Sequence, residues 1–130
     1  MKPFDLQVNG YAGTDFCSSS LTGDQLHNAC RALVEDGVDG ILVTLITDGI
    51  ESLASKLAEI VRFRERDELA RRVIAGFHVE GPFLNPSPGF IGAHEPLCVR
   101  PANVDDAQRL LDAGAGLVKL FTLAPEQDAG

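Results

Sequence analysis

Three short apolar runs, separated by segments long enough to form helices, constrain the fold of this chain more than any other feature. They occupy residues 40–45, 73–79 and 117–123. Runs of this length with few polar residues are typical of strands covered on both faces in a parallel sheet. A fourth segment, 4–9, alternates apolar and polar residues and is predicted to be a strand with one polar face. The repeated order of strand, helix and strand predicts right-handed βαβ units and an α/β fold.

Helix start signals lie between the predicted strands. Thr22 and Gln25 have the spacing of a capping box, and Thr47 or Asp48 can cap a second helix. Asn103 is predicted to cap a third helix. The residues that this third helix is expected to turn inward are Val104, Ala107, Leu110 and Leu111. We therefore expect four strands alternating with three helices.

Charge and cysteine content exclude several classes of partner. Eleven basic against 19 acidic residues give a formal charge of −8 and no basic stripe for phosphates, so neither a nucleic acid nor an anionic membrane is expected as a partner. No apolar run approaches the roughly 20 residues of a membrane-spanning helix, and a cytoplasmic location is predicted. Cys17, Cys30 and Cys98 form no CxxC pair and are expected to be small buried residues. The charged run 62–72 is predicted to be a solvated helix end.

Polar side chains gather where the predicted strands end. Gln7 and Asn9 lie two residues apart at the end of the first strand, and His78 and Glu80 do so at the end of the third. In parallel α/β folds, reactive groups sit at the carboxyl ends of strands. Glu80 is therefore a candidate metal ligand, although a carboxylate in this position also caps helices or accepts backbone hydrogen bonds. His78 fits either a core residue or a ligand, and His94, in a loop rich in glycine and proline, either a substrate contact or a loop residue.

Several short motifs occur in an order that resembles one enzyme family. They are DLQVNG at 5–10, HVEGPFL at 78–84, GAH at 92–94 and TLAPE at 122–126. In this order and spacing, the motifs resemble those of the N-acetylglucosamine-6-phosphate deacetylases, in the amidohydrolase superfamily. The resemblance implies a (β/α)8 barrel that removes the acetyl group of an amino-sugar phosphate with a metal-bound water. Such barrels take about 250 residues, so residues 1–130 are expected to form one partial barrel domain, about half of the ring.

The resemblance also implies roles for individual residues. Glu80 matches the family's metal-binding glutamate, and Ala93 and His94 match the pair that contacts the sugar substrate. Gln7 and Asn9 stand at a vestigial second-metal position, where many amidohydrolases have two histidines. Because amides are poorer ligands than imidazole for transition metals, a single divalent metal, zinc or iron, is implied. The family's two metal-binding histidines and its catalytic aspartate are expected beyond residue 130, so this chain is expected to bind metal weakly or not at all and to be inactive alone.

Two other interpretations stay open at this stage. A half-barrel with uncovered outer strands is expected to form a homo-oligomer or to pair with a second half, without catalysing a reaction. A dihydroorotase-like amidohydrolase is the other, because Lys119 lies on the fourth strand, where some relatives carry a carbamylated lysine between two metals. Lys119 sits in mid-strand, however, and the histidine pair of those enzymes is replaced here. Glu126, at the end of the fourth strand, is expected to be structural.

Overall fold

The structure, a computed structural model, describes residues 3–127 and is built on one four-stranded parallel sheet. The strand order is β1-β4-β5-β6, and all three neighbouring pairs are parallel. The strands are β1 (Phe4–Val8), β4 (Gly40–Ile46), β5 (Ile74–Glu80) and β6 (Val118–Thr122). The predicted α/β fold with four parallel strands is thereby confirmed. The sheet does not close into a barrel within residues 3–127.

A small hairpin follows β1, in a segment where no strand is predicted from the sequence. Its strands are β2 (Gly10–Tyr11) and β3 (Thr14–Asp15), which pair in antiparallel fashion. Between them, Ala12 and Gly13 both have positive φ angles, 49° and 80°. Two consecutive residues in the left-handed region are what a tight two-residue hairpin turn requires. The first predicted strand is accordingly shorter than expected and ends at Val8.

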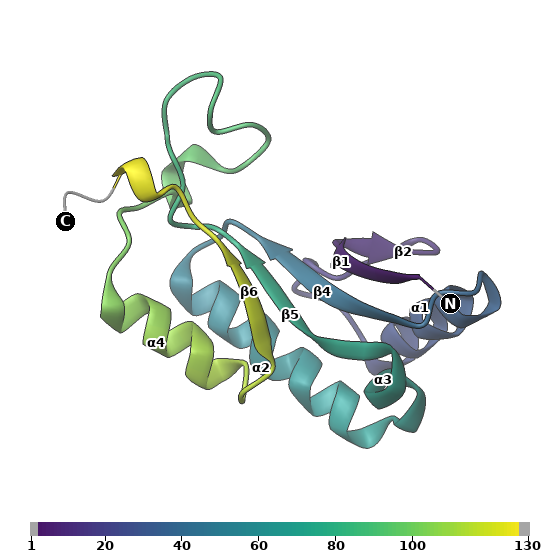
Figure 1. The fold of residues 1–130 in the computed structure, drawn as a ribbon. Helices are drawn as coiled ribbons and strands as arrows, with labels where there is room; N and C mark the ends of the chain where they lie inside the picture. The colour runs from purple at the N-terminus through teal and green to yellow at the C-terminus, as the bar shows by residue number, and fades with distance from the viewer. Residues whose placement is uncertain (1–2, 128–130) are drawn as a thin grey trace.

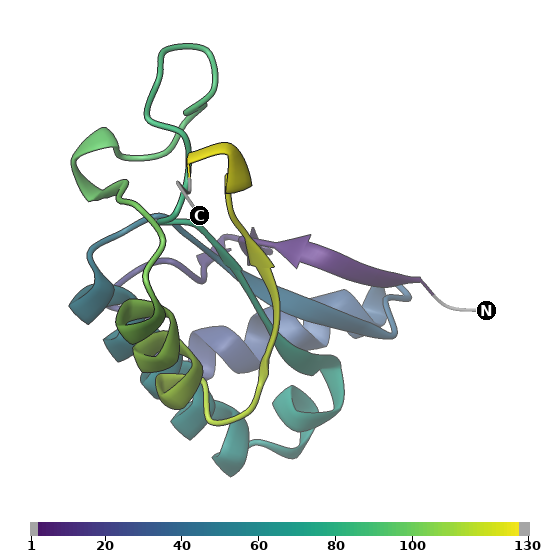
Figure 2. The same ribbon diagram turned by 60° about the vertical axis from the view of Figure 1, so that its left-hand side comes forward.

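Four helices pack against one side of the sheet, and within residues 3–127 no helix lies on its other side (Figures 1 and 2). They are α1 (Gly23–Glu35), α2 (Ile50–Arg66), α3 (Glu68–Val73) and α4 (Val104–Ala113). Two short 3-10 turns complete the chain, η1 (Pro96–Cys98) and η2 (Pro125–Gln127). None of the helices in the described part of the chain is both long and apolar enough to cross a membrane.

Two of the predicted N-caps are confirmed and the third is not. Thr22 caps α1 through the predicted capping box, and Asn103 caps α4 by accepting a hydrogen bond from a backbone N–H. The prediction that Thr47 or Asp48 caps α2 is wrong, because Gly49 is the N-cap. The Asp48 carboxylate instead accepts hydrogen bonds from other donors, among them the Lys56 ammonium at 2.6 Å.

Two further expectations about helices are wrong. Val104 was expected to face inward, yet 81% of it is exposed, because α4 lies at the end of the helix layer and only Leu110 of this helix is fully buried. The run 62–72 does not form one helix end. Asp67 adopts extended backbone angles (φ −128°, ψ 113°), which end α2 and begin α3.

The core lies between the sheet and the helix layer. Alternate residues of β4 enter it, as expected for the central position of this strand. From β5, Phe77 and Val79 join them, and α2 contributes three fully buried aliphatic side chains. These helix residues are Leu53, Leu57 and Ile60. Both edge strands are much more exposed, and Phe4 (48%), Leu6 (57%) and Leu120 (39%) are large apolar residues in contact with solvent.

Asp67 links α1 to α3. Its Oδ1 accepts hydrogen bonds from the N–H groups of Leu69 and Ala70, and its Oδ2 lies 2.7 Å from Nδ1 of His27 on α1. Partial burial raises the pKa of this carboxyl, but the hydrogen bonds from His27 and the two amides outweigh that effect, so the pKa of Asp67 is lowered from 3.8. The carboxylate therefore favours the folded state most strongly when it is ionised.

Asp67→Asn is expected to destabilise the protein at neutral pH and to have less effect in acid. Asparagine still caps α3 but carries no charge. A carboxylate with a lowered folded-state pKa contributes stability above its unfolded pKa and loses it as the pH falls through the folded value. The difference in unfolding free energy between the two proteins should therefore shrink below about pH 4. Urea unfolding at a series of pH values measures it, and a difference that stays constant with pH would contradict the assignment.

Candidate functional site

Three of the residues singled out in the sequence meet at the carboxyl end of the sheet. Gln7 Nε2 donates a hydrogen bond to Glu80 Oε2 at 3.1 Å. On the other side of the carboxylate, His94 Nε2 lies 3.7 Å from Glu80 Oε1, an ion-pair distance rather than a hydrogen bond. These side chains come from β1, β5 and the loop after β5. Strand ends therefore place an amide, a carboxylate and an imidazole in one cluster, which we call the Glu80 cluster.

The backbone around Glu80 is fixed by both neighbouring strands. Glu80 pairs in register with Ile46 of β4 and with Thr122 of β6. Thr47 Oγ1 donates to the Glu80 carbonyl at 3.3 Å, and the N–H of Gly81 donates to the Thr122 carbonyl at 3.1 Å. Gly81 then adopts φ +93° and turns the chain out of the sheet. The carboxylate is thus held at the last position of a strand that is hydrogen-bonded on both sides.

Asn9 does not reach the Glu80 carboxylate. Its Nδ2 donates instead to the backbone carbonyl of Thr44 at 3.3 Å. Of the two amides at the vestigial second-metal position, only Gln7 therefore contacts Glu80. The Gln7 contact joins the first strand to the third strand of the sheet across β4, and it depends on how the sheet is staggered rather than on local sequence.

His78 is a hydrogen-bonded core residue, one of the two roles open from the sequence. It is only 3% exposed. Its Nε2 lies 2.7 Å from Thr122 Oγ1 on β6, and its Nδ1 lies 3.4 Å from Thr44 Oγ1 on β4. Both ring nitrogens therefore have a hydroxyl partner, and His78 bridges three adjacent strands. The two threonines were not predicted as partners of His78, although a polar residue inside each apolar run is a signal for such a contact.

His94 is held in the loop between β5 and α4. Its side chain is 15% exposed, and its backbone N–H donates to the Ile91 carbonyl at 3.4 Å. Nδ1 of the ring is buried without a hydrogen-bond partner among the described residues. A buried nitrogen in this state costs about 1–3 kcal/mol relative to a paired one. Ala93, the other predicted substrate contact, is exposed on the same loop.

The Glu80 cluster does not by itself meet the requirements of a catalytic zinc site. Such sites use three protein ligands, whereas this cluster offers one carboxylate and one imidazole. The 3.7 Å between Glu80 Oε1 and His94 Nε2 also exceeds the roughly 3.4 Å expected between two ligands on one tetrahedral zinc. Across residues 3–127, no group of three His, Cys, Asp or Glu side chains is placed to hold a metal ion. Any further ligands would have to come from outside these residues.

Two other charged candidates have structural partners. Glu126 Oε1 accepts a hydrogen bond from Asn85 Nδ2 at 3.1 Å, which ties the loop after β5 to the segment after β6. Lys119 Nζ donates to the Gly116 carbonyl at 2.9 Å, before the start of β6. The lysine is therefore directed toward the amino end of its strand, away from Glu80. This direction does not favour a carbamylated lysine between two metals.

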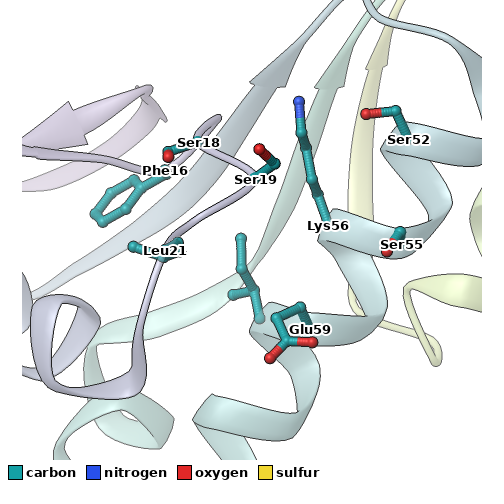
Figure 3. A pocket seen from close by; sticks show the side chains of 9 residues that line it. Phe16, Ser18, Ser19, Leu21, Ser52, Ser55, Lys56 and Glu59 are labelled. Carbon is teal, nitrogen blue, oxygen red and sulfur yellow. The ribbon is translucent and has the colours of Figure 1, made fainter.

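A separate cavity of about 350 Å³ lies between the loop before α1 and the outer surface of α2 (Figure 3). Four serines line it together with Lys56 and Glu59. Lys56 is paired with Asp48. Burial raises the pKa of the Asp48 carboxyl, but hydrogen bonds from Lys56, Ser52 and Gly49 outweigh that effect, so the pKa is lowered overall. The ammonium is thus neutralised, and the cavity offers no free positive charge for a phosphate.

The known sequences that this chain resembles carry one enzyme name. No family model matches the chain. An N-acetylglucosamine-6-phosphate deacetylase of Bacillus subtilis (strain 168) is 29% identical over 126 residues, which are 95% of the chain and 31% of that relative. The enzyme of the same name from Bos taurus is 32% identical over 125 residues, covering 94% of the chain and 30% of the relative. The chain therefore spans about 30% of the length of the curated relatives it matches.

Solved structures extend the likeness to the fold. An N-acetyl-D-glucosamine-6-phosphate deacetylase mutant from Mycobacterium smegmatis, in complex with N-acetyl-D-glucosamine-6-phosphate, matches with a TM-score of 0.83 and 31% identity. The match covers 98% of this chain and 31% of that one. The deacetylase of Pasteurella multocida matches with a TM-score of 0.78, 25% identity and 97% coverage, again over 31% of its length. Over nearly its whole length, the chain is thus similar in sequence and in fold to one part of the N-acetylglucosamine-6-phosphate deacetylases, as its motifs predict.

Proposed function

We propose that this chain forms part of the active site of an N-acetylglucosamine-6-phosphate deacetylase, which hydrolyses the acetamide of an amino-sugar phosphate. Glu80 is one ligand of a single divalent metal, zinc or iron, and Ala93 and His94 contact the sugar. The observation that carries the proposal is the Glu80 cluster, in which Gln7 and His94 approach the carboxylate from opposite sides. The remaining metal ligands and the catalytic aspartate come from residues beyond 130.

The chemistry of the cluster supports these roles. A carboxylate at the end of a buried strand is fixed in place and can serve as a ligand without reorganising. His94 lies on the loop that follows β5 and keeps 15% of its side chain exposed, and loops next to strand ends are where parallel α/β folds bind substrates. Because Gln7 donates to Glu80, it holds one carboxylate oxygen and leaves the other directed toward His94. A cytoplasmic location and the absence of nucleic-acid and membrane partners stay predictions.

His94→Ala is expected to weaken the binding of N-acetylglucosamine 6-phosphate to the chain about tenfold or more, because one hydrogen bond to a polar ligand is lost. Titration followed by ¹⁵N–¹H NMR measures the affinity. We expect the amides of Ala93 and His94 and the side-chain amide of Gln7 to shift in the wild type. His27→Ala is the matched control, since this histidine lies on α1 and contacts Asp67 instead of Glu80.

The same titration can overturn the proposal. Equal affinities for the wild type and His94→Ala would remove His94 from the substrate contacts. Shifts confined to residues of α1 and α2 would place the ligand on the helix side of the molecule. A second titration with unphosphorylated N-acetylglucosamine separates recognition of the acetamide from binding of the phosphate. The shifts at Ala93 and His94 should persist with the unphosphorylated sugar, because the described cluster has no basic group other than His94.

A further inference from the structure

Residues 85–99, which we call the His94 loop, leave the end of β5 and return to it. The N–H of Arg100 donates to the Pro82 carbonyl at 3.0 Å and closes the base of the loop. Within residues 3–127, one hydrogen bond joins the His94 loop to another segment, from Asn85 Nδ2 to Glu126 Oε1 at 3.1 Å. We call this pair the loop tether, because it fixes the start of the loop to the segment after β6.

Asn85 connects the tether to the backbone of the loop. Its side chain is buried, and both ends of its amide are used. Nδ2 donates to Glu126, and Oδ1 accepts a hydrogen bond from the N–H of Ser87 at 3.0 Å. A side-chain amide can make both bonds at once because it carries a donor and an acceptor. The Glu126 carboxylate therefore orients the group that begins the first turn of the loop.

Consecutive turns connect Ser87 to His94. The Ser87 carbonyl accepts a hydrogen bond from the N–H of Ile91 at 3.2 Å, and the Ile91 carbonyl accepts one from the N–H of His94 at 3.4 Å. Gly89 and Gly92 lie within these turns at φ angles of 88° and 62°, a region that glycine adopts without strain. An unbroken path of hydrogen bonds thus runs from the loop tether to His94.

We propose that Glu126 is a positioning residue, which holds His94 beside the Glu80 cluster by way of Asn85. The inference rests on the proposed function, in which His94 contacts the sugar. A loop that is ordered before the substrate arrives loses less conformational entropy on binding, and its contacts are already close to their final geometry. A carboxylate suits this role because hydrogen bonds to a charged acceptor are stronger than those between neutral groups.

Exchange of donor and acceptor tests the tether. In Asn85→Asp the donor is lost and two carboxylates face one another, so the loop should separate from the segment after β6. In Glu126→Gln a side-chain oxygen still accepts from Asn85, and the loop should stay as in the wild type. In the double variant Asn85→Asp/Glu126→Gln, the introduced amide donates to the introduced carboxylate, whose second oxygen still accepts from Ser87. The second substitution should therefore have little effect alone and repair the first.

Two measurements follow the variants. The backbone amide of His94 in ¹⁵N–¹H NMR reports the position of the loop without ligand, and titration with N-acetylglucosamine 6-phosphate gives the affinity. Asn85→Asp should shift the His94 signal and weaken binding about tenfold, and the double variant should recover both. Glu126→Ala should act in the same direction as Asn85→Asp. Glu65→Ala, which removes an exposed carboxylate from α2, is the matched control and should change neither.

Recovery in the double variant is specific to the tether, because general damage from Asn85→Asp is not repaired by a change at position 126. Circular dichroism of each variant verifies that the fold is kept. An unchanged His94 signal in Asn85→Asp, a double variant that recovers neither property, or an affinity that stays constant while the loop moves would each overturn the positioning role. If the His94 signal responds as expected but even the wild type does not bind the sugar phosphate, the tether is correct and the proposed function is wrong.

Discussion

Phe77→Ala is expected to lower the free energy of unfolding by about 3–5 kcal/mol. Phe77 is completely buried at the centre of β5 and belongs to the core between the sheet and the helices. Its removal leaves a cavity that the surrounding strands cannot fill by moving, because β5 is hydrogen-bonded on both sides. Since domains of this size are stable by about 5–15 kcal/mol, the loss is a large part of the total. Urea unfolding followed by circular dichroism measures it.

A matched control separates burial from residue type. Phe90→Ala removes the same side chain from a position that is 74% exposed, and it should change the stability by less than about 0.5 kcal/mol. Equal losses for the two variants would mean that the core does not lie between β5 and the helices as described.

Gly81→Ala is expected to destabilise the protein by about 2–4 kcal/mol and to weaken sugar-phosphate binding as well. At φ +93° an alanine is strained, and its Cβ would collide with the Thr47 side chain. Relief of this collision requires movement at the end of β5, where the neighbouring residue is Glu80. We therefore expect the hydrogen bond from Gln7 to Glu80 to be disturbed. Urea unfolding gives the stability, and the ¹⁵N shift of the Gln7 side-chain amide reports the contact.

Gly89→Ala isolates the backbone contribution in this comparison. Gly89 also has a positive φ, +88°, but a Cβ there would meet no atom within 4 Å. Its cost should be limited to about 1–2 kcal/mol, and the Gln7 amide should not shift. If both glycine variants behave alike, crowding against Thr47 plays no part.

Local signals account for the elements that were predicted correctly. The apolar runs form β4, β5 and β6, and the two central strands, β4 and β5, are buried along most of their length. The edge strand β6 is more exposed than its apolar run predicts. The capping box at Thr22 acts within four residues, and therefore it can be read without tertiary contacts. The β2–β3 hairpin was missed because two-residue strands leave no periodicity, and its turn contains Ala12 at positive φ, a conformation that sequence does not signal.

The wrong predictions depend on contacts that capping signals and hydrophobic periodicity do not encode. Val104 has the helical spacing of an inward residue, but no further element covers that side of α4 in the described chain. Asp48 fits a cap, yet it binds Lys56 instead. Within the site, the positions of Glu80 and Gln7 at strand ends predicted that both lie at the carboxyl edge of the sheet. Their direct contact follows from the stagger of three strands, which no local pattern encodes.

The bridge that His78 makes between Thr44 and Thr122 has a consequence for proton placement. A hydroxyl group rotates and serves as donor or acceptor, so each threonine can adapt to whichever ring nitrogen carries the hydrogen. Either neutral tautomer of the imidazole is therefore accommodated without moving a heavy atom. An isosteric valine at position 44 or 122 would leave one ring nitrogen without its hydroxyl partner, so that only the remaining threonine could adapt to the position of the hydrogen.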